Sequence, residues 1–331
     1  MKTPNKDWRE EIASDEDKRF QEYSEKIIEV QRKKSKLFGN GRALHRKQLC
    51  GLKANFQVLD NLPDYAKQGL FASPANYNAW IRISNGGVDV KSDSAPDIRG
   101  FAIKVLGLNG PSALGNGNTQ HQDFTLINQP AFAFSKSAPF ISLVLAASES
   151  PFALVKHLFG SYGFFGGIQK VTATAKTFGR PFSGFLTETF YSAAPIACGE
   201  YAARVRLVSK LNKSNYTSNK SDLSLDIKNI LTKEEVVFDL QLQFFVDEKI
   251  TPIEDASVDW DETEAPYITV AKLTIPKQDF DSEEGKKLSL ETEKTFFDPW
   301  NALLSHRPLG DVMRTRKYIY YASQKERGAN K

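Results

Sequence analysis

The charged N-terminal stretch carries apolar residues at helical spacing. Within residues 6–36 these apolar positions are Phe20, Tyr23, Ile27, Ile28 and Val30. Their period predicts an amphipathic helix that ends before the glycine-containing turn at 39–41. We therefore expect residues 1–41 to form an N-terminal helical segment and residues 42–331 to form the main domain.

Short runs rich in β-branched and aromatic residues follow, and they predict strands. These runs are residues 49–59, 78–84, 98–106, 124–128, 202–209, 236–246 and 267–275. Gly- and Asn-rich stretches at 85–87 and 107–118 lie between them and favour hairpin connections. About seven or eight strands with helices at both ends predict an α+β fold built on a closed antiparallel barrel.

The middle and the end of the chain differ from these runs. Helix-like pieces at 141–147 and 154–159 precede a Gly- and Phe-rich patch at 160–167. The polar run 211–233 predicts an excursion over the surface. The last segment, 300–327, predicts a helix with a turn inside it at Pro308-Leu309-Gly310.

The amino-acid composition excludes some classes of binding partner. The chain has 44 Lys and Arg against 40 Asp and Glu, a net charge of +4, and no basic stripe interleaved with aromatic residues. We therefore expect no nucleic-acid partner. No stretch approaches the about 18 consecutive apolar residues of a membrane helix, and the N-terminus lacks an apolar signal-peptide core. We expect no membrane span and, by default, a cytoplasmic location.

The cysteines and the aromatic residues allow only general interpretations. Cys50 and Cys198 are the only cysteines and form no Cys-x-x-Cys pair, so we expect buried free thiols. The 23 Phe and 11 Tyr suit a barrel packed around a flat apolar ligand. An ordinary aromatic core explains them equally well.

The terminal helix concentrates polar chemistry on one face. Arg316, Tyr320, Gln324 and Arg327 fall within roughly an 80° arc of an ideal helix. The Arg316 guanidinium can reach the Tyr320 phenol, four residues on. A tyrosine with a pKa of about 10 needs about 4 kcal/mol of help to ionise at neutral pH, which a ferric ion and an arginine supply. Arg314 and Tyr318 repeat the spacing on the opposite face, and a basic surface helix has the same pattern.

Several segments, in chain order, resemble catalase. Arg42-Ala43-Leu44-His45 resembles the Arg-x-x-His that carries the distal histidine, and Arg82-Ile83-Ser84 resembles the Arg-Phe-Ser strand. The most specific match is residues 97–104, Asp-Ile-Arg-Gly-Phe-Ala-Ile-Lys, which is close to Asp-Pro-Arg-Gly-Phe-Ala-Val-Lys. Residues 123–132 resemble the strand that ends in the distal asparagine.

The C-terminal segments continue the resemblance. Residues 297–301 resemble Phe-Asp-Pro-x-Asn, and Arg316, Tyr320 and Arg327 match Arg-x-x-x-Tyr with an arginine seven residues later. With residues 306–310, they are most similar to small catalase-related haem proteins, which include peroxidases and allene oxide synthases. The resemblance implies that 42–331 is a catalase-like barrel of about eight strands with flanking helices, without the wrapping arm and C-terminal domain.

The resemblance also implies a haem cofactor and a role for each matching residue. Tyr320 would ligate ferric iron with its phenolate, moderated by Arg316. His45 would act as general base and then acid, Asn128 would hydrogen-bond the peroxide, and Ser84 would orient His45.

Further matching residues would surround the cofactor. Arg42, Arg82 and Arg327 would pair with the haem propionates. Phe132 would form part of the distal wall, and Asp97 would lie in the access channel.

Three functions remain open at the level of sequence. The first is an enzyme of the catalase or peroxidase type that consumes hydrogen peroxide or an organic hydroperoxide, as in an oxidative stress response. The second is a fatty-acid hydroperoxide isomerase or lyase of the allene oxide synthase type. The third is a non-catalytic haem or lipid carrier, for which His45 would be dispensable. We also expect the chain to form a homodimer.

Overall fold

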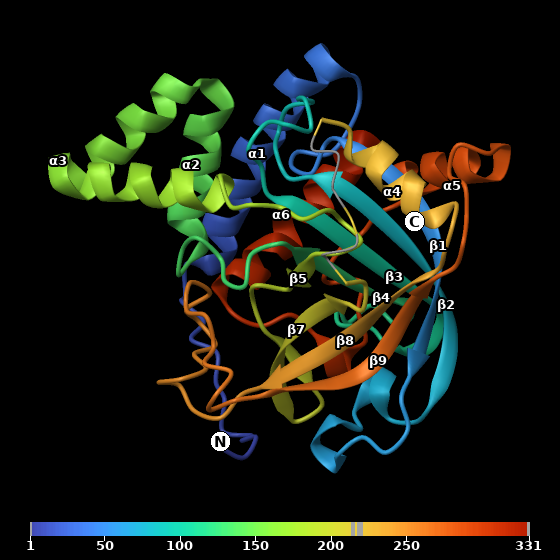
Figure 1. Ribbon diagram of the computed structural model, residues 1–331. Coiled ribbons are helices and arrows are strands. Elements are labelled where there is room, and N and C mark those ends of the chain that lie inside the picture. Colours follow the sequence, from blue (N-terminus) through green and yellow to red (C-terminus); the bar gives the residue numbers. More distant parts are fainter. Residues whose placement is uncertain (1, 213–215, 217–220, 330–331) are drawn as a thin grey trace.

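The computed structural model describes residues 2–212, 216 and 221–329. Its strands form one antiparallel sheet in the order β5-β4-β3-β2-β1-β9-β8-β7-β6 (Figure 1). Their bounds are β1 Gln48–Val58, β2 Ala75–Asn85, β3 Arg99–Pro111, β4 Asn118–Ile127, β5 Thr189–Tyr191, β6 Ile196–Cys198, β7 Tyr201–Ser209, β8 Val236–Phe244 and β9 Tyr267–Ile275. Because β5 also pairs with β7, eight strands close into a barrel and β6 is a further strand beside β7.

The helices lie outside the barrel. Their bounds are α1 Glu16–Phe38, α2 Ser137–Glu149, α3 Pro151–Phe178, α4 Leu223–Leu231, α5 Glu283–Lys294 and α6 Asp311–Arg327. Helix α1 packs along α6, where the rings of Phe20 and Tyr318 lie 5.7 Å apart and Gln31 donates to the Ser323 carbonyl. The segment 1–41 therefore contacts the far end of the chain (Figure 1).

Side chains fill the barrel interior. Alternate residues of the strands point inward, and Phe56, Phe101 and Phe238 are among the completely buried ones. The rings of Phe101 and Phe238 lie 5.4 Å apart across the interior. These three phenylalanines belong to the packed core of the barrel.

The structure corrects several predicted boundaries. Helix α1 begins at Glu16 rather than near residue 6, because residues 2–8 run extended and Trp8 donates to the Glu200 carbonyl. Helix α3 continues through the Gly- and Phe-rich patch, with a break at Gly163. At the C-terminus only Asp311–Arg327 is α-helical, because Gly310, at φ +86°, ends the preceding loop.

The prediction for the polar run 211–233 is wrong in its second half. Residues 213–215 and 217–220 lie outside the described residues, but α4 is a helix that packs on the barrel core. Its buried residues are Leu223, Ile227, Ile230 and Leu231, which lie at helical spacing within the polar surroundings. The Asp222 side chain caps this helix by accepting from the Leu225 amide.

Two general expectations hold in the described residues. The fold is the predicted α+β barrel with flanking helices, and Cys50 and Cys198 are buried free thiols. Among the described helices, none combines the length and the apolar character needed to cross a bilayer.

Candidate functional site

A cavity lies between the outer face of the barrel and the helices α1, α2 and α6. The strands β2, β3 and β4 line it with the residues that alternate with the core, such as Ser84, Gly100 and Thr125. The space free of protein atoms in the cavity and its open mouth, solvent included, is about 1340 Å³. Most of its wall is apolar, including Leu44 and Phe132.

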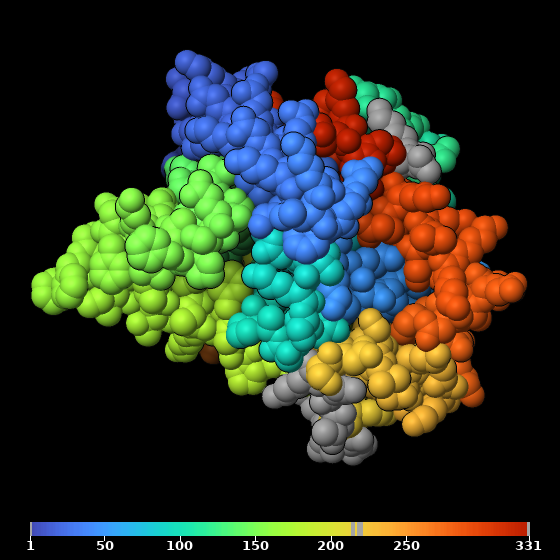
Figure 2. Space-filling view, turned by 90° about the horizontal axis from the view of Figure 1, so that it is seen from above, coloured from blue at the N-terminus to red at the C-terminus, as the bar shows by residue number. Residues whose placement is uncertain are grey.

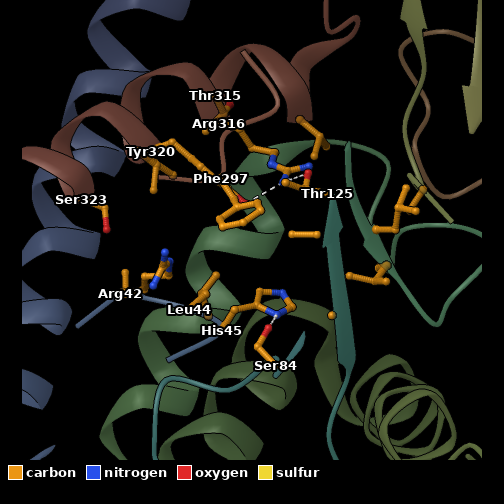
Figure 3. Close-up of a pocket in the computed structure, with 18 of the residues that line it drawn as sticks. Arg42, Leu44, His45, Ser84, Thr125, Phe297, Thr315, Arg316, Tyr320 and Ser323 are labelled. Atoms are coloured by element: carbon orange, nitrogen blue, oxygen red, sulfur yellow. Dashed lines mark hydrogen bonds between the residues drawn. The ribbon is translucent and has the colours of Figure 1, made fainter. Parts of the chain in front are cut away.

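Helix α6 turns its two Arg/Tyr pairs to opposite sides. Arg316 points into the cavity and donates from Nη2 to the Tyr320 hydroxyl at 2.6 Å and to Thr125 Oγ1 at 2.7 Å (Figure 3). Tyr318 instead donates to Asp17 of α1, which raises its pKa to about 12. Spacing left the two tyrosines equivalent, and the structure brings Tyr320 into the cavity.

Arg314 holds α6 in place from the outer side. Its guanidinium binds the carboxylates of Glu10, Glu16 and Glu254 at 2.7–2.8 Å. This network ties the helix to the N-terminal segment and to the loop after β8. It therefore fixes the rotation of α6 that directs Tyr320 inward.

His45 lies on the side of the cavity opposite Tyr320 (Figure 3). Its backbone has φ +51°, unusual for a residue other than glycine, and its amide donates to the Gly86 carbonyl. Gly100 is required beside the ring, since a Cβ there would overlap the imidazole. The Nδ1 atom lies 3.1 Å from Ser84 Oγ, so Nε2 is the nitrogen available to a ligand.

The imidazole of His45 is neutral at physiological pH. Burial lowers its pKa to about 3, and the cations of Arg82, Arg316 and Arg42 contribute to the lowering. A neutral imidazole with a free nitrogen is ready to accept a proton from a ligand in the cavity.

Three arginines, here called the arginine cluster, line one end of the cavity: Arg42, Arg82 and Arg327. Glu293 of α5 lies among them, and its carboxylate accepts from Arg42 at 2.6 Å and from Arg82 at 2.9 Å. Arg327 donates to the carbonyls of Glu293 and Thr295 at the end of α5. In the described part of the chain, Glu293 is the one carboxylate hydrogen-bonded to the cluster, which leaves two positive charges in excess.

The close packing of these charged groups shifts their pKa values. Burial and the neighbouring Arg82 lower the pKa of Arg42, and burial lowers that of Arg327 to about 10. Burial raises the pKa of Glu293, but the guanidiniums of Arg82 and Arg42 outweigh it and lower the pKa overall. An anionic ligand at this end would relieve the repulsion among the arginines.

A buried ion pair connects the other matching segments. Lys104 of β3 lies 2.8 Å from Asp123 of β4, and Asp123 also accepts from the Asp298 amide. This contact holds the turn at 297–301 against the barrel and places Phe297 in the cavity wall. The Asp298 side chain in turn accepts from Gln324 of α6 at 2.7 Å.

Two of the expected residues lie outside the cavity lining. Asn128 is buried behind β3, where its Oδ1 accepts from the Arg99 amide at 2.8 Å. Asp97 accepts from the Gly87 amide in the turn that follows β2, and burial raises its pKa. The remaining predicted residues are cavity-lining: His45, Ser84, Arg42, Arg82, Phe132, Arg316, Tyr320 and Arg327.

Some residues at the site were missed by the sequence analysis. Glu293 is the main one, and its helix α5 was not predicted, although Ser282 before two glutamates is a recognisable N-cap signal. The hydroxyls of Ser137 and Thr315, also in the wall, are buried without a partner among the described residues. Polar atoms left in this way suit a cavity that receives a ligand.

The donor set fits a haem bound through tyrosine. The cavity has a phenol paired with an arginine on one side, a neutral imidazole on the other, apolar walls, and an arginine cluster with two excess charges for two propionates. In the described residues no cluster of three or more His, Cys, Asp and Glu side chains is arranged to hold a bare metal ion.

Comparison with known proteins shows the fold. No protein-family model matches the sequence, and no curated protein matches it. Among solved structures, catalase A from Saccharomyces cerevisiae is similar, with a TM-score of 0.69 at 16% identity over 87% of this chain and 61% of that one. A fungal catalase is also similar, with a TM-score of 0.67 at 18% identity over 88% of this chain and 60% of that one.

A bacterial catalase is a third similar structure, with a TM-score of 0.61 at 14% identity over 87% of this chain and 57% of that one. The chain thus spans about 60% of the length of the catalases it matches. At these identities the likeness concerns the arrangement of the backbone. The chain therefore has a catalase-like fold, a closed antiparallel barrel of eight strands with one further strand and flanking helices.

Proposed function

We propose that this protein binds haem in the cavity through the Tyr320 phenolate and consumes hydroperoxides. The observation that carries the proposal is the pair of Arg316 and Tyr320, 2.6 Å apart, facing the neutral His45 across an apolar cavity. When bound, ferric haem supplies the redox chemistry that cleaves a peroxide O–O bond. The surrounding residues would bind and orient the hydroperoxide and transfer its proton.

His45 is the proton-handling group of the proposed mechanism. Its Nε2 takes the proton of a bound hydroperoxide and returns it to the oxygen that departs. Ser84 holds Nδ1, and Gly100 leaves space for the ring, so the imidazole keeps one orientation during this transfer. The guanidinium of Arg316 donates to the Tyr320 hydroxyl and holds it toward the cavity.

The arginine cluster is proposed to bind the two propionates. It contributes three positive charges, and Glu293 offsets one of them. Bidentate pairing of guanidinium and carboxylate groups would orient the cofactor in the cavity. The free hydroxyls of Ser137 and Thr315 are further donors to a group in the cavity.

The position of Asn128 favours a second candidate, a fatty-acid hydroperoxide isomerase or lyase. Asn128 is not among the cavity-lining residues and its Oδ1 accepts from the Arg99 amide, so it is not placed to steady a small peroxide beside His45. The cavity instead offers apolar contacts from Phe132, Phe140 and Ile141, which suit an alkyl chain. Oxygen release from hydrogen peroxide supports dismutation, whereas an epoxide or aldehyde formed from a fatty-acid hydroperoxide supports rearrangement.

The test of the proposal is the visible absorption spectrum of the haem-supplemented protein and of two matched variants. Tyr320→Phe should abolish or shift the Soret band and the high-spin ferric bands, because it removes the ligand oxygen. Tyr318→Phe, on the opposite face of the same helix, should leave the spectrum unchanged. A protein that stays colourless with haem, or a spectrum indifferent to Tyr320, would refute the ligand assignment.

A further inference from the structure

The hairpin formed by α2 and α3 projects from the body of the protein (Figures 1 and 2). It exposes aromatic side chains. Helix α3 breaks at Gly163, where φ is +69°, and Gly167 packs against the Phe159 ring beyond the break. The residues next to the break form the tip. There Phe164 is 67% exposed and Phe165 is 84% exposed, and Phe152 nearer the base is 76% exposed.

The α2–α3 hairpin itself is positively charged: residues 137–178 contain Lys156, Lys170 and Lys176 but one acidic residue, Glu149, a net charge of +2. No acidic residue lies between Ser150 and Thr187, which includes all of α3.

These two properties together indicate the kind of partner. An aromatic tip that protrudes can enter a lipid interface with its rings among the headgroups. Lys156 and Lys176 are exposed on α3, one on each side of the break, and anionic headgroups attract exposed basic residues. The charge of the hairpin complements an anionic surface and not a basic one.

We propose that the α2–α3 hairpin docks this protein on an anionic lipid bilayer, with Phe164 and Phe165 inserted among the headgroups. The inference does not depend on haem or on peroxide chemistry. It does bear on access, because α2 forms one wall of the cavity with Phe140 and Ile141. A docked hairpin would therefore place that wall next to the bilayer.

Vesicle flotation of the full chain tests the proposal. The protein should float with phosphatidylcholine vesicles that contain phosphatidylglycerol, and less with phosphatidylcholine alone or at high salt. Phe164→Ser with Phe165→Ser should lower the partition coefficient by at least about tenfold. The control, Leu37→Ser with Leu290→Ser, changes side chains that are 70% and 61% exposed on α1 and α5 and should leave flotation unchanged.

A second pair of variants separates charge from apolar insertion. Lys156→Gln with Lys176→Gln should weaken binding to the anionic vesicles only, whereas Lys286→Gln with Lys287→Gln, equally exposed on α5, should not. Circular dichroism checks that every variant is folded.

Two results would overturn the proposal. One is wild-type protein that stays with the aqueous phase when anionic vesicles float. The other is a wild-type dimer, seen by light scattering, that the Phe164→Ser, Phe165→Ser variant converts to a monomer without any effect of lipid. That result would assign the hairpin to contact between two copies of the chain.

Discussion

At the scale of single residues, Glu293 stands out because it occupies the place that an anionic group of a ligand would take. Its carboxylate bridges Arg42 and Arg82, while Arg327 contacts the backbone of the same turn. Without it, three buried cations would face one another. Glu293 therefore stabilises the ligand-free protein and, under the proposed function, competes with the propionates.

We expect Glu293→Gln to have opposite effects on the free and haem-bound protein. The melting temperature without ligand should fall, because the arginine cluster loses its carboxylate. Affinity for haem should rise by about tenfold, since a propionate no longer displaces a charged group. Haem titration followed at the Soret band measures this, with Glu291→Gln on the same helix as the control. Weaker haem binding by the Glu293 variant would mean that the carboxylate positions the arginines for the ligand.

His45 should make the protein less stable in acid. Its pKa is about 6.5 in the unfolded chain and about 3 in the folded one. Between these values the unfolded state binds a proton that the folded state does not. The free energy of unfolding should therefore fall by about 1.4 kcal/mol per pH unit as pH decreases from 6.5, and be unaffected above it.

His45→Gln should remove this contribution. Urea unfolding at several pH values between 4 and 6.5 gives the slope of the unfolding free energy against pH for wild type and variant. The contributions of the other titrating groups cancel in the difference between the two slopes. If the free energy of unfolding of the two proteins changed with pH to the same extent, that result would contradict a buried neutral imidazole.

At the scale of elements, helix α6 connects the N-terminal segment to the cavity. One face carries Arg314 and Tyr318 toward residues 10–17, and the other carries Arg316 and Tyr320 toward His45. Periodicity predicted both pairs but not which one is enclosed. That choice depends on Glu10, Glu16 and Glu254, which come from distant parts of the chain and have no local signature.

Removing the anchor of α6 should destabilise the whole protein. Arg314→Met removes the cation that three carboxylates share, although Glu10 keeps Arg307, and should lower the free energy of unfolding by about 3–5 kcal/mol. The guanidinium is only 11% exposed, so solvent screens it little. Lys325→Met, exposed on the same helix, should have little effect. Equal urea midpoints for the two variants would show that α6 is held by its apolar contacts alone.

The sequence predicted long elements better than short or context-dependent ones. The seven expected strands are all present, because each alternates or runs apolar over enough residues to reveal its period. Strands β5 and β6 have three residues each, too few for any pattern, yet β5 closes the barrel. Helix α4 was missed because it is only nine residues long and lies within the polar run 211–233.

At the scale of the whole molecule, the site consists of segments from both ends of the printed sequence. Their residue types were recognisable, so most of the candidate residues could be predicted to meet around one cavity. Asn128 shows the limit of that inference, since a matching residue at the end of β4 turns toward the Arg99 amide instead. Glu293 shows the converse, because its role arises only when α5 packs beside β1 and β2.

The cavity lies on the outer face of β2, β3 and β4, while the packed core lies on their inner face. Neighbouring positions on these strands are therefore subject to different constraints during evolution. In a saturation library, core positions such as Ile103 should accept only changes that conserve volume, whatever ligand is selected for. Cavity positions such as Ala102 and Thr125 should vary with the ligand, so that the tolerance map of each strand alternates with a period of two residues.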